Sequence, residues 1–337
     1  MFRIDIQQDG ASDWTDRIAG YPNLSLLQCG EYGDAKAAVD GWRVERGLIA
    51  SDTGEPAPFQ ALIRNLPGLG GGLVWLNRAP LLAADADGPA LDGVLGALRR
   101  HYVDGQGFYL RVAPALPSLD PASPAPAPTG FDPAGAAGWA SAALDLAPDA
   151  DALRASLRRN WRSHLNKSER ADLAVASGAE GQPFDDFLAG FRRFIGDQGI
   201  ATSVTPGLIG ELQARLPAGR KLQAYVAERD GEPLAGVLIA RYGPTAEYLA
   251  AYSSHPGRKL GAGQNLLWRA IVDAKAAGAR RFDMGGMDPD QTPEGIFKFK
   301  DGVRPVPYRL MAEVEASNGG WLSRLVRWRV RRARAGN

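Results

Sequence analysis

KLQAYVAERDGEPLAGVLIARYGPTAEYLAAYSS, residues Lys221 to Ser254, decides the fold class. Its apolar runs are separated by two turn signals, Asp230-Gly231 and Gly243-Pro244, which predict antiparallel strands joined by tight turns. HPGRKLGAGQNLLWRAIVDAKAAGA follows, and it predicts a loop with glycines and then an amphipathic helix. RRFDMGG then predicts a strand that ends at a glycine turn. This order of elements indicates a domain that mixes strands and helices.

The first half of the chain shows the same mixture. QALIRNL, GGLVWLNRAP and GFYLRVAP predict strands, and DGVLGALRRHYVD predicts a helix. Between the halves lies APALPSLDPASPAPAPTGFDPAGAAG, Ala113 to Gly138, whose prolines suit an extended connector better than a central strand. A length of 337 residues fits two domains of ordinary size.

Composition excludes several classes of function. The formal net charge is +1, so no global field draws the chain to nucleic acid or membrane. Cys29 is the only cysteine, which excludes an internal disulfide and suits a reducing compartment. The histidines His101, His164 and His255 lack the spacing of metal ligands, so we expect no metal site. The start has no signal-peptide pattern and no apolar run is long enough for a membrane span, so we expect a cytoplasmic protein.

DADALRASLRRNWRSHLNKSERA predicts one strong helix, with Asp149 or Asp151 as its N-cap. Arg154, Arg158 and Arg162 recur every four residues and would form one stripe on it. A solvated face explains most such stripes. The absence of an acid between Arg154 and Lys167 suits a polyanionic ligand instead, and Arg162 is our candidate to contact substrate.

Arg258, Gly261 and Gly263 lie between a predicted strand and a predicted helix. Glycines at a helix start let backbone N–H groups approach a phosphate, and the helix dipole favours that anion. The Arg-x-x-Gly-x-Gly pattern resembles the pyrophosphate loop of GNAT acyltransferases, which implies a site for the donor's phosphates. A plain glycine-rich turn before a helix is the competing interpretation.

The tail GGWLSRLVRWRVRRARAGN holds six arginines and no acid between Trp321 and Asn337. On a helix, Trp321, Leu325 and Trp328 would share one face. The other face would carry the arginines Arg324, Arg327, Arg331 and Arg334. Such a helix suits an anionic membrane surface or RNA phosphates, and it equally suits a terminal helix that docks its tryptophans on the body.

In EGIFKFKDGVRP, aromatic and lysine residues alternate from Phe297 to Lys300. Alternation with period two predicts a strand with both phenylalanines on one face and both lysines on the other. Neither a Ser-His-Asp nor a Cys-His set is evident in the sequence. A direct transfer, catalysed by positioning and charge stabilisation, therefore fits better than covalent catalysis.

These segments together resemble the FemABX peptidyltransferases, a family similar in fold to GNAT acyltransferases. LLQCGEYGDAKAAVDGWR resembles the family's opening motif and keeps Gln28 and Lys36. VWLNRAP keeps Arg78 and Pro80 of an "R-G-P" strand end, and LRVAP resembles the strand that closes the first domain. WASAALDLAPD with the basic helix resembles the second-domain entry, and FDMGGMDPDQTPEGIFKFKDG resembles "Y-D-L-x-G-I … G-I-Y-R-F-K-x-G".

The resemblance implies two tandem GNAT-like domains with mixed sheets. They would span residues 1–137 and 138–315, with the tail 316–337 packing back on the first and the transfer site in the second. Members of the family move an amino acid from aminoacyl-tRNA to an amine, usually on a cell-wall precursor. The resemblance thus implies peptidoglycan biosynthesis with aminoacyl-tRNA and a muropeptide or lipid-linked precursor as partners, and no cofactor.

The resemblance also assigns roles to residues. Lys300 would stabilise the oxyanion with Phe299 beside it, and Asp301 or Asp283 would keep that lysine charged. The candidates for substrate binding are Lys36 and Arg78, as ligands of phosphates or carboxylates, and Tyr248 and Tyr252, beside the acceptor channel. Exposed cations at a strand end and tyrosines in the core are the plainer interpretations, and Lys298 is expected to be surface.

Departures from the pattern leave the donor open. Val303, Arg304 and Pro305 stand where the family has Phe-Gly-Gly, and the sequence lacks a long heptad arm. The glycine pattern from Arg258 resembles an acyl-CoA loop more than the family's own. A second hypothesis is therefore an acyl-CoA-dependent N-acyltransferase acting on an amino sugar or small amine for surface polysaccharide. A third is a non-catalytic protein whose tail binds a membrane partner, against which the intact Phe299-Lys300 pair argues. Peripheral contact with the inner face of a membrane through residues 321–334 is a separate expectation.

Overall fold

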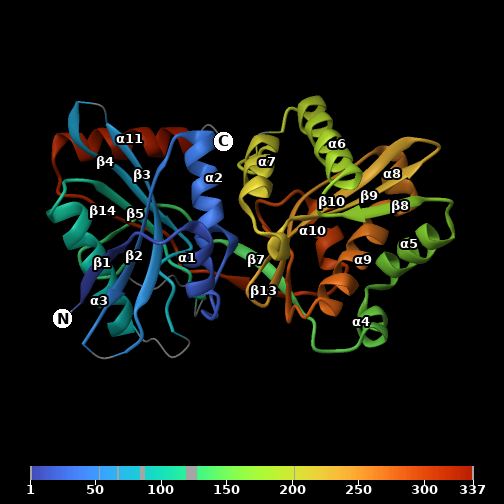
Figure 1. The fold of residues 1–337 in the computed structure, drawn as a ribbon, viewed down its shortest axis with the longest axis horizontal. Helices are drawn as coiled ribbons and strands as arrows, with labels where there is room; N and C mark the ends of the chain where they lie inside the picture. Colours follow the sequence, from blue (N-terminus) through green and yellow to red (C-terminus); the bar gives the residue numbers. More distant parts are fainter. Residues whose placement is uncertain are drawn as a thin grey trace. The chain divides into compact units, whose positions relative to one another are not determined.

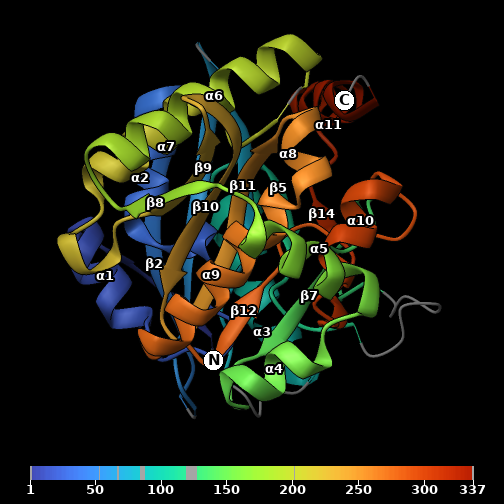
Figure 2. The same cartoon turned by 90° about the vertical axis from the view of Figure 1, so that its right-hand side faces the viewer.

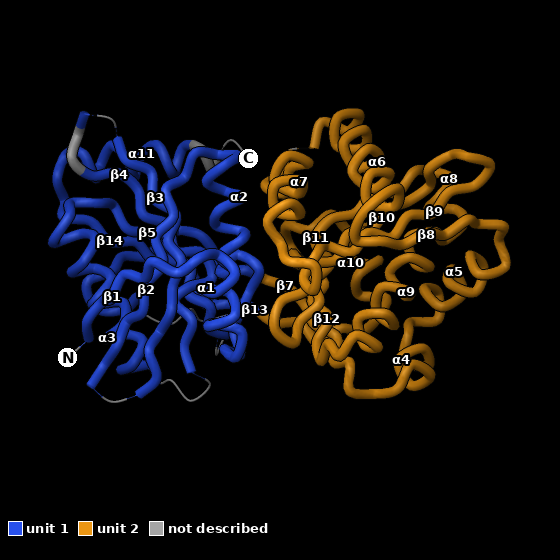
Figure 3. The backbone as a smooth tube through the Cα atoms, in the orientation of Figure 1, with its two compact units in different colours: residues 1–139, 309–337 blue, residues 140–308 orange. Residues whose placement is uncertain are grey.

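The computed structural model (Figure 1, Figure 2) describes residues 2–52, 54–66, 68–83, 88–118, 127–200 and 202–335. The chain forms two compact units, coloured separately in Figure 3. Unit 1 comprises Met1–Trp139 and Arg309–Asn337, and unit 2 comprises Ala140–Tyr308. The sequence predicts domain boundaries after residues 137 and 315, whereas the chain changes unit after Trp139 and Tyr308.

Unit 1 is built on a seven-stranded sheet with the order β1-β2-β3-β4-β5-β14-β6. Its strands are β1 (Arg3–Gln7), β2 (Arg43–Ala50), β3 (Ala57–Leu66), β4 (Leu69–Asn77), β5 (Tyr109–Ala113), β14 (Val314–Ala316) and β6 (Asp132–Pro133). β1 to β4 form an antiparallel meander, and β4 pairs with β5 in parallel. A parallel pair needs a crossover connection, and α3 (Gly88–Leu98) lies in this one.

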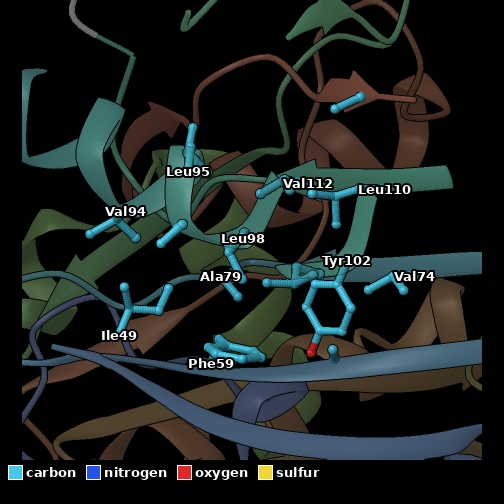
Figure 4. Close-up of a cluster of buried hydrophobic side chains, with 14 of the residues drawn as sticks. Ile49, Phe59, Val74, Ala79, Val94, Leu95, Leu98, Tyr102, Leu110 and Val112 are labelled. Carbon is cyan, nitrogen blue, oxygen red and sulfur yellow. The ribbon is translucent and has the colours of Figure 1, made fainter. Parts of the chain in front are cut away.

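The core of unit 1 lies between α3 and the sheet. Figure 4 shows Leu95 and Leu98 of α3 beside Phe59 of β3 and Tyr102 of the π-helical turn Arg99–Asp104. These side chains are fully or almost fully buried. The remaining helices of unit 1 are α1 (Ala11–Ile18), α2 (Gly30–Asp40) and α11 (Trp321–Ala335).

A buried glutamine connects α2 to this sheet. Gln28 ends the 3-10 turn before α2 and is 1% exposed. Its Nε2 donates to the carbonyl oxygens of Gln60 (3.2 Å) and Asn77 (2.9 Å), and its Oε1 accepts from the Gln60 N–H at 2.7 Å. The motif position that we took from the family resemblance therefore holds two strands and a turn together.

The proline-rich connector lies partly outside the described residues, which omit 119–126. Its described end contains β6, which pairs with β14 in the sheet of unit 1. This end of the segment is therefore built into unit 1.

Unit 2 is built on a second seven-stranded sheet, with the order β13-β7-β12-β11-β10-β9-β8. Its strands are β13 (Val306–Arg309), β7 (Ala140–Asp145), β12 (Arg281–Asp283), β11 (Thr245–Ser253), β10 (Glu232–Tyr242), β9 (Gln223–Arg229) and β8 (Ala174–Gly178). β9, β10 and β11 form the antiparallel meander predicted from the turns at Asp230 and Gly243. β11 and β12 pair in parallel across a helical connection.

Helices cover both faces of the unit 2 sheet. They are α4 (Ala150–Ser156), α5 (Arg159–Arg170), α6 (Gln182–Gln198), α7 (Pro206–Arg215), α8 (His255–Leu260), α9 (Ala262–Ala276) and α10 (Glu294–Asp301). Figure 2 shows α6 on one side of β9 and β10 and α9 on the other. Among the described residues, no helix is both long and apolar enough to cross a lipid bilayer.

The two units repeat one topology. If the sheet of unit 1 is followed from β1 and the sheet of unit 2 from β8, the strands β1 to β5 correspond to β8 to β12. The last two strands, β14 and β6, then correspond to β7 and β13. α1 and α2 follow β1 as α6 and α7 follow β8, and α3 occupies the crossover that α9 occupies in unit 2. The predicted fold class, two tandem domains with mixed sheets, is confirmed.

The prediction of a strand at Phe297–Lys300 is wrong, because these residues lie in α10. Pro293 precedes the helix, Glu294 lies in its first turn, and Lys298 pairs with Glu294 one turn away. An acid at the helix N-terminus and an i,i+4 ion pair both favour helix. Four alternating residues are too few to separate a strand from one turn of helix.

The single basic helix predicted from Asp151 to Arg170 is also wrong, because the chain breaks into α4 and α5. Leu157 and Arg158 are extended, with ψ of 142° and 140°. The Arg158 N–H donates to the carbonyl of Gly302 at 3.0 Å, so a tertiary contact satisfies the backbone at the break. Asp149 caps α4 as predicted, accepting from the Ala152 N–H at 2.7 Å.

The Gln28 contacts predict a stability effect. Gln28→Ala should lower the free energy of unfolding by about 3 kcal/mol, because it leaves buried groups of β3 and β4 without partners. Gln8→Ala is the matched control, since Gln8 is exposed and its loss should cost less than about 0.5 kcal/mol. Urea unfolding of both variants measures the difference, and equal losses would contradict this role for Gln28.

Candidate functional site

β11 and β12 separate after three paired positions, and this opening defines the site. Thr245, Ala246 and Glu247 pair with Arg281, Phe282 and Asp283. β11 continues to Ser253, but the chain after β12 leaves it. The N–H groups of Met284 and Met287 donate instead to the carbonyls of Ala142 and Ala140 on β7, at 2.9 Å each. Among the described residues, Tyr248–Ser253 therefore has no strand neighbour on this side.

A glycine allows the two strands to part. Gly285 has φ of +66°, a conformation that residues with a Cβ rarely adopt. A Cβ on it would lie 2.7 Å from the Tyr248 carbonyl oxygen and 3.8 Å from Lys300 Nζ. The chain thus turns away from β11 at a place where the backbone and the lysine both approach closely.

Lys300 is buried at this opening. The residue is 7% exposed, and its Nζ donates to the carbonyl of Gly286 at 2.8 Å. The ammonium also lies 5.3 Å from the centre of the Tyr248 ring, in cation–π range. An ammonium has three N–H donors, and within the described residues only Gly286 accepts from this one. The other two donors thus have no acceptor among the described residues.

Two buried carboxylates provide the negative charge near Lys300. Asp283, 4% exposed, accepts from Ser141 Oγ (2.7 Å), the Gly285 N–H (2.9 Å) and Tyr308 Oη (2.6 Å). Glu247, 7% exposed, accepts from a tyrosine hydroxyl at 2.6 Å. These hydrogen bonds, together with one from the Arg281 guanidinium to Asp283 at 3.1 Å, hold both groups in place. The two acids are directly paired in the strand register, which places one on each of the parting strands.

Burial lowers the pKa of Lys300 to about 8, and the negative charges of Asp283 and Glu247 oppose that lowering. Lys300 is therefore mostly protonated at neutral pH, although it lies in a low-dielectric environment. The sequence suggested two acids as partners of Lys300, and one of them, Asp283, raises its pKa by charge attraction. Asp301 instead forms an ion pair with Arg158 at 2.7 Å.

Phe299 packs against the other aromatic side chains of the site. Its ring centre lies 6.3 Å from that of Trp161 and 6.4 Å from that of Tyr248. Its carbonyl accepts from Trp161 Nε1 at 3.0 Å, which ties α10 to α5. Phe299 thus fixes the helix that carries Lys300, and it contributes an apolar wall next to Tyr248.

Tyr248 lies next to Lys300, whereas Tyr252 lies on the other face of the sheet. Ile239 pairs with Tyr248 and Leu238 with Ala250, so Leu249 is an extra residue that forms a bulge. A bulge reverses the facing of later side chains. Tyr252 therefore packs on Phe187 of α6, in a slot where a Cβ on Gly190 would lie 2.4 Å from its hydroxyl. Desolvation raises the pKa of Tyr252 to about 12.

The predicted glycine loop is largely helical. α8 occupies His255–Leu260, and Gly261, with φ of +74°, ends it and begins α9. The Arg258 guanidinium donates to the carbonyl of Ser253 at 2.7 Å, and the Gly261 N–H donates to the carbonyl of Arg258. A Cβ at Gly261 would lie 2.5 Å from the His164 carbonyl, whereas Gly263 faces Phe299 at an ordinary distance of 3.5 Å.

The predicted arginine stripe does not form one surface, because its members belong to two helices and have separate partners. Arg154 binds Glu169, and the two groups shift each other's pKa toward the charged forms. Arg158 binds Asp301. Arg162 donates to the carbonyl of Ala155 at 3.1 Å, which bridges α4 and α5.

Lys36 and Arg78 belong to unit 1, and Lys300 belongs to unit 2. Lys36, on α2, forms an ion pair with Asp40 one turn later. Arg78 is 8% exposed and has φ of +55°, and its guanidinium lies 4.4 Å above the ring of Trp139.

Sequence reasoning missed Glu247, Ser141 and Trp161 as parts of the site. Ser141 and Trp161 precede Lys300 by more than a hundred residues, and no local pattern connects them to it. Glu247 carried a signal, since it is an acid in the middle of an apolar strand. A buried acid requires partners, so its position alone pointed to a polar site.

The lowered pKa of Lys300 predicts how stability changes with pH. The unfolded chain holds this proton up to lysine's ordinary pKa of 10.5, while the folded chain releases it near 8. Between these values the unfolded state binds more protons, so the free energy of unfolding should rise with pH, by up to about 3 kcal/mol.

Urea unfolding between pH 7 and 11 measures that rise. Lys300→Met should remove it, and Lys298→Met, an exposed lysine on the same helix, should keep it. Parallel profiles for wild type and Lys300→Met would contradict the pKa shift.

Comparison with known proteins agrees with this geometry. Residues 153–301 match the family model described as "Acetyltransferase (GNAT) domain". No curated protein sequence matches the chain. The crystal structure of FemX is similar over 96% of this chain and 100% of its own, with 15% identity and a TM-score of 0.77.

Two further solved structures show the same two-domain fold. A tandem GNAT protein from the clavulanic acid biosynthesis pathway matches 95% of this chain and 99% of its own, with 12% identity and a TM-score of 0.54. The C-terminal domain of a proposed lysylphosphatidylglycerol synthetase from Agrobacterium fabrum matches 94% of this chain and 93% of its own, with 14% identity and a TM-score of 0.51. The protein is therefore an acyltransferase with a GNAT domain in unit 2 and, as the family resemblance implied, the tandem GNAT-like fold of FemX.

Proposed function

We propose that this protein moves an amino acid from aminoacyl-tRNA to an amine of a peptidoglycan precursor or a related envelope substrate. The observation that carries the proposal is the buried ammonium of Lys300, which lies where β11 and β12 part and has one acceptor within the described part of the chain. The likeness to FemX over the whole chain supports the aminoacyl donor, as does the likeness to a lysylphosphatidylglycerol synthetase domain.

The proposed reaction needs no covalent enzyme intermediate. The acceptor amine attacks the carbonyl carbon of the aminoacyl ester, and the carbonyl oxygen becomes an oxyanion. Collapse of this intermediate breaks the ester bond, the ribose oxygen of the tRNA takes up a proton, and the new amide nitrogen loses one. An ester is already activated, so alignment of the amine and one cation at the carbonyl oxygen supply most of the catalysis.

Lys300 suits the role of that cation. Its contact with the Gly286 carbonyl and the rings of Tyr248 and Phe299 fix its position before substrate binds. Because the ammonium is desolvated, its interaction with a developing negative charge is stronger than in water. Asp283 and Glu247 act on Lys300 by keeping it protonated, so we regard them as positioning residues.

The segment before α9 is less open than a phosphate loop, which weakens the support for acyl-CoA as donor. A phosphate loop offers backbone N–H groups that are free to bind the ligand. Here the N–H groups of Gly257, Arg258 and Gly261 already donate within the chain, and the Arg258 side chain is bound to Ser253. An acyl-CoA-dependent N-acyltransferase acting on an amino sugar or small amine remains the second candidate, supported by the GNAT domain match.

The remaining assignments follow from the same proposal. Tyr248 would border the acceptor site next to Lys300. Tyr252 lies on the other face of the sheet, where it would serve only to pack against α6. Lys36 and Arg78 of unit 1 are the proposed ligands of the precursor's phosphates or carboxylates. On α5, Arg159 and Arg170 are exposed cations for the tRNA backbone, and Arg162 would act by holding α5 to α4. We place the reaction in the cytoplasm, without a cofactor.

Substitution of Lys300 tests the catalytic assignment. Lys300→Met should reduce the transfer rate by about 10²- to 10³-fold, the usual cost of losing one oxyanion donor. Lys298→Met should retain the wild-type rate, since Lys298 is exposed and pairs with Glu294. Single-turnover transfer from charged tRNA measures both rates. Full activity in Lys300→Met would refute the oxyanion role.

The donor is tested by binding and transfer in parallel. Charged tRNA should raise the melting temperature and support transfer to a muropeptide amine, and uncharged tRNA should give no product. Acetyl-CoA should do neither. Stabilisation and transfer by acetyl-CoA, with no response to charged tRNA, would favour the second candidate instead.

A further inference from the structure

α11 is fastened to unit 1 by one face. Leu322 packs against β4, where a Cβ on Gly71 would lie 3.4 Å from its Cδ2. Val326 is 6% exposed and Ser323 is 3% exposed, and the Ser323 hydroxyl donates to Asn318 Oδ1 at 3.0 Å. These residues share the helix face that is turned to the sheet.

Two of the arginines serve this attachment. Arg327 and Arg331 both bind Glu315 of β14, whose carboxylate is buried and also accepts from Tyr109 Oη. A buried carboxylate needs such partners. Arg327 and Arg331 therefore stabilise the attachment of α11 to β14, and we do not count them among the ligand-binding charges.

The opposite face exposes tryptophan. Trp321 is 67% exposed and Trp328 is 54% exposed, although tryptophan is usually well buried. Half-buried Leu325 lies between them, at i+4 from Trp321. Arg332, at i+4 from Trp328, stacks its guanidinium 5.3 Å from the centre of the Trp328 ring. The face is thus an apolar stripe along the helix.

Exposed positive charge flanks this stripe. Arg324 lies on one side of the stripe and Arg329 on the other. Arg332 lies at the C-terminal end of the stripe. From Trp321 to Asn337 the sequence contains no acid, so nothing on the helix neutralises these charges.

We propose that the outer face of α11, formed by Trp321, Arg324, Leu325, Trp328, Arg329 and Arg332, binds the surface of an anionic lipid bilayer. Indole rings favour the headgroup level, arginines at the flanks bind lipid phosphates, and the helix axis lies parallel to the surface. RNA is a poorer match, because the apolar stripe occupies the centre of the face and Glu315 binds the two arginines that would widen the cationic part. The proposal stands independently of the transfer reaction.

The test is sedimentation of the full chain with vesicles. Equimolar phosphatidylcholine and phosphatidylglycerol should bind the protein, pure phosphatidylcholine should bind it much more weakly, and added salt should release it. Trp321→Ala with Trp328→Ala should lower the partition coefficient by at least about tenfold. Arg324→Gln with Arg332→Gln should lower it to a similar degree, about fivefold for each arginine.

The matched control removes the same charge elsewhere. Arg215→Gln with Arg229→Gln, at exposed arginines of unit 2, should bind vesicles as the wild type does. A second measurement reports directly on the two tryptophans, with conservative variants as its control. Brominated lipids should quench tryptophan emission of the wild type, and Trp321→Phe with Trp328→Phe should lose that quenching while still binding.

Each outcome decides the proposal. Loss of binding in the α11 variants with retention in the control supports it, as does quenching assigned to Trp321 and Trp328. Equal loss in the control pair would show a nonspecific charge effect and overturn it. Binding to a random RNA with no binding to anionic vesicles would overturn it in favour of nucleic acid, and binding to neither would also overturn it.

Discussion

The burial of one ammonium group, that of Lys300, is the constraint on which the arrangement of unit 2 depends. A desolvated cation is stable only near negative charge, and Asp283 and Glu247 provide it from the two strands that part at that point. Asp283 is itself held by Ser141 and Tyr308, from the strand beside it and the edge of the sheet. The charge balance of one side chain thus involves β7, β11, β12 and β13.

The apolar contacts around the site serve the same position. α10 is short, and its partners outside the helix decide where Lys300 points. Trp161 binds the Phe299 carbonyl, and Gly302 leaves room for its indole, since a Cβ there would lie 2.0 Å from the ring. The break between α4 and α5 ends at the same place, with the Arg158 N–H on the Gly302 carbonyl. Segments far apart in the sequence therefore fix the position of Lys300, as the proposed role of an oxyanion donor would require.

These contacts also explain what the sequence could predict. The meander from Gln223 to Ser253 and the following helix were predictable, because turn signals and apolar runs of adequate length agree there. The family resemblance singles out Lys300 as a candidate, although the secondary structure of its segment was predicted wrongly. The residues Phe297–Lys300 fit both the two-residue period of a strand and one turn of a helix. In the helix, Phe299 packs against Trp161 and Tyr248, and these tertiary contacts favour the helical form.

Other features depend on information that a local pattern does not hold. The bulge at Leu249 separates Tyr248 from Tyr252, yet the spacing of four residues would place them on one face of a regular strand. The arginine stripe fails because Leu157 and Arg158 leave the helix to contact a glycine far along the chain. In both cases a backbone irregularity, fixed by tertiary structure, changes which side chains meet.

Within the described residues, the repeated topology shows where the two sheets differ. In unit 1, β4 and β5 stay paired through five positions to Asn77 and Ala113, at the end of both strands. In unit 2, β12 is short and a glycine turns the chain away after Asp283, so β11 extends beyond its neighbour. The same order of strands thus gives continuous pairing at the crossover in unit 1, and in unit 2 an opening lined by Lys300. Strand length and one glycine at the crossover, rather than topology, distinguish the unit that carries the candidate site.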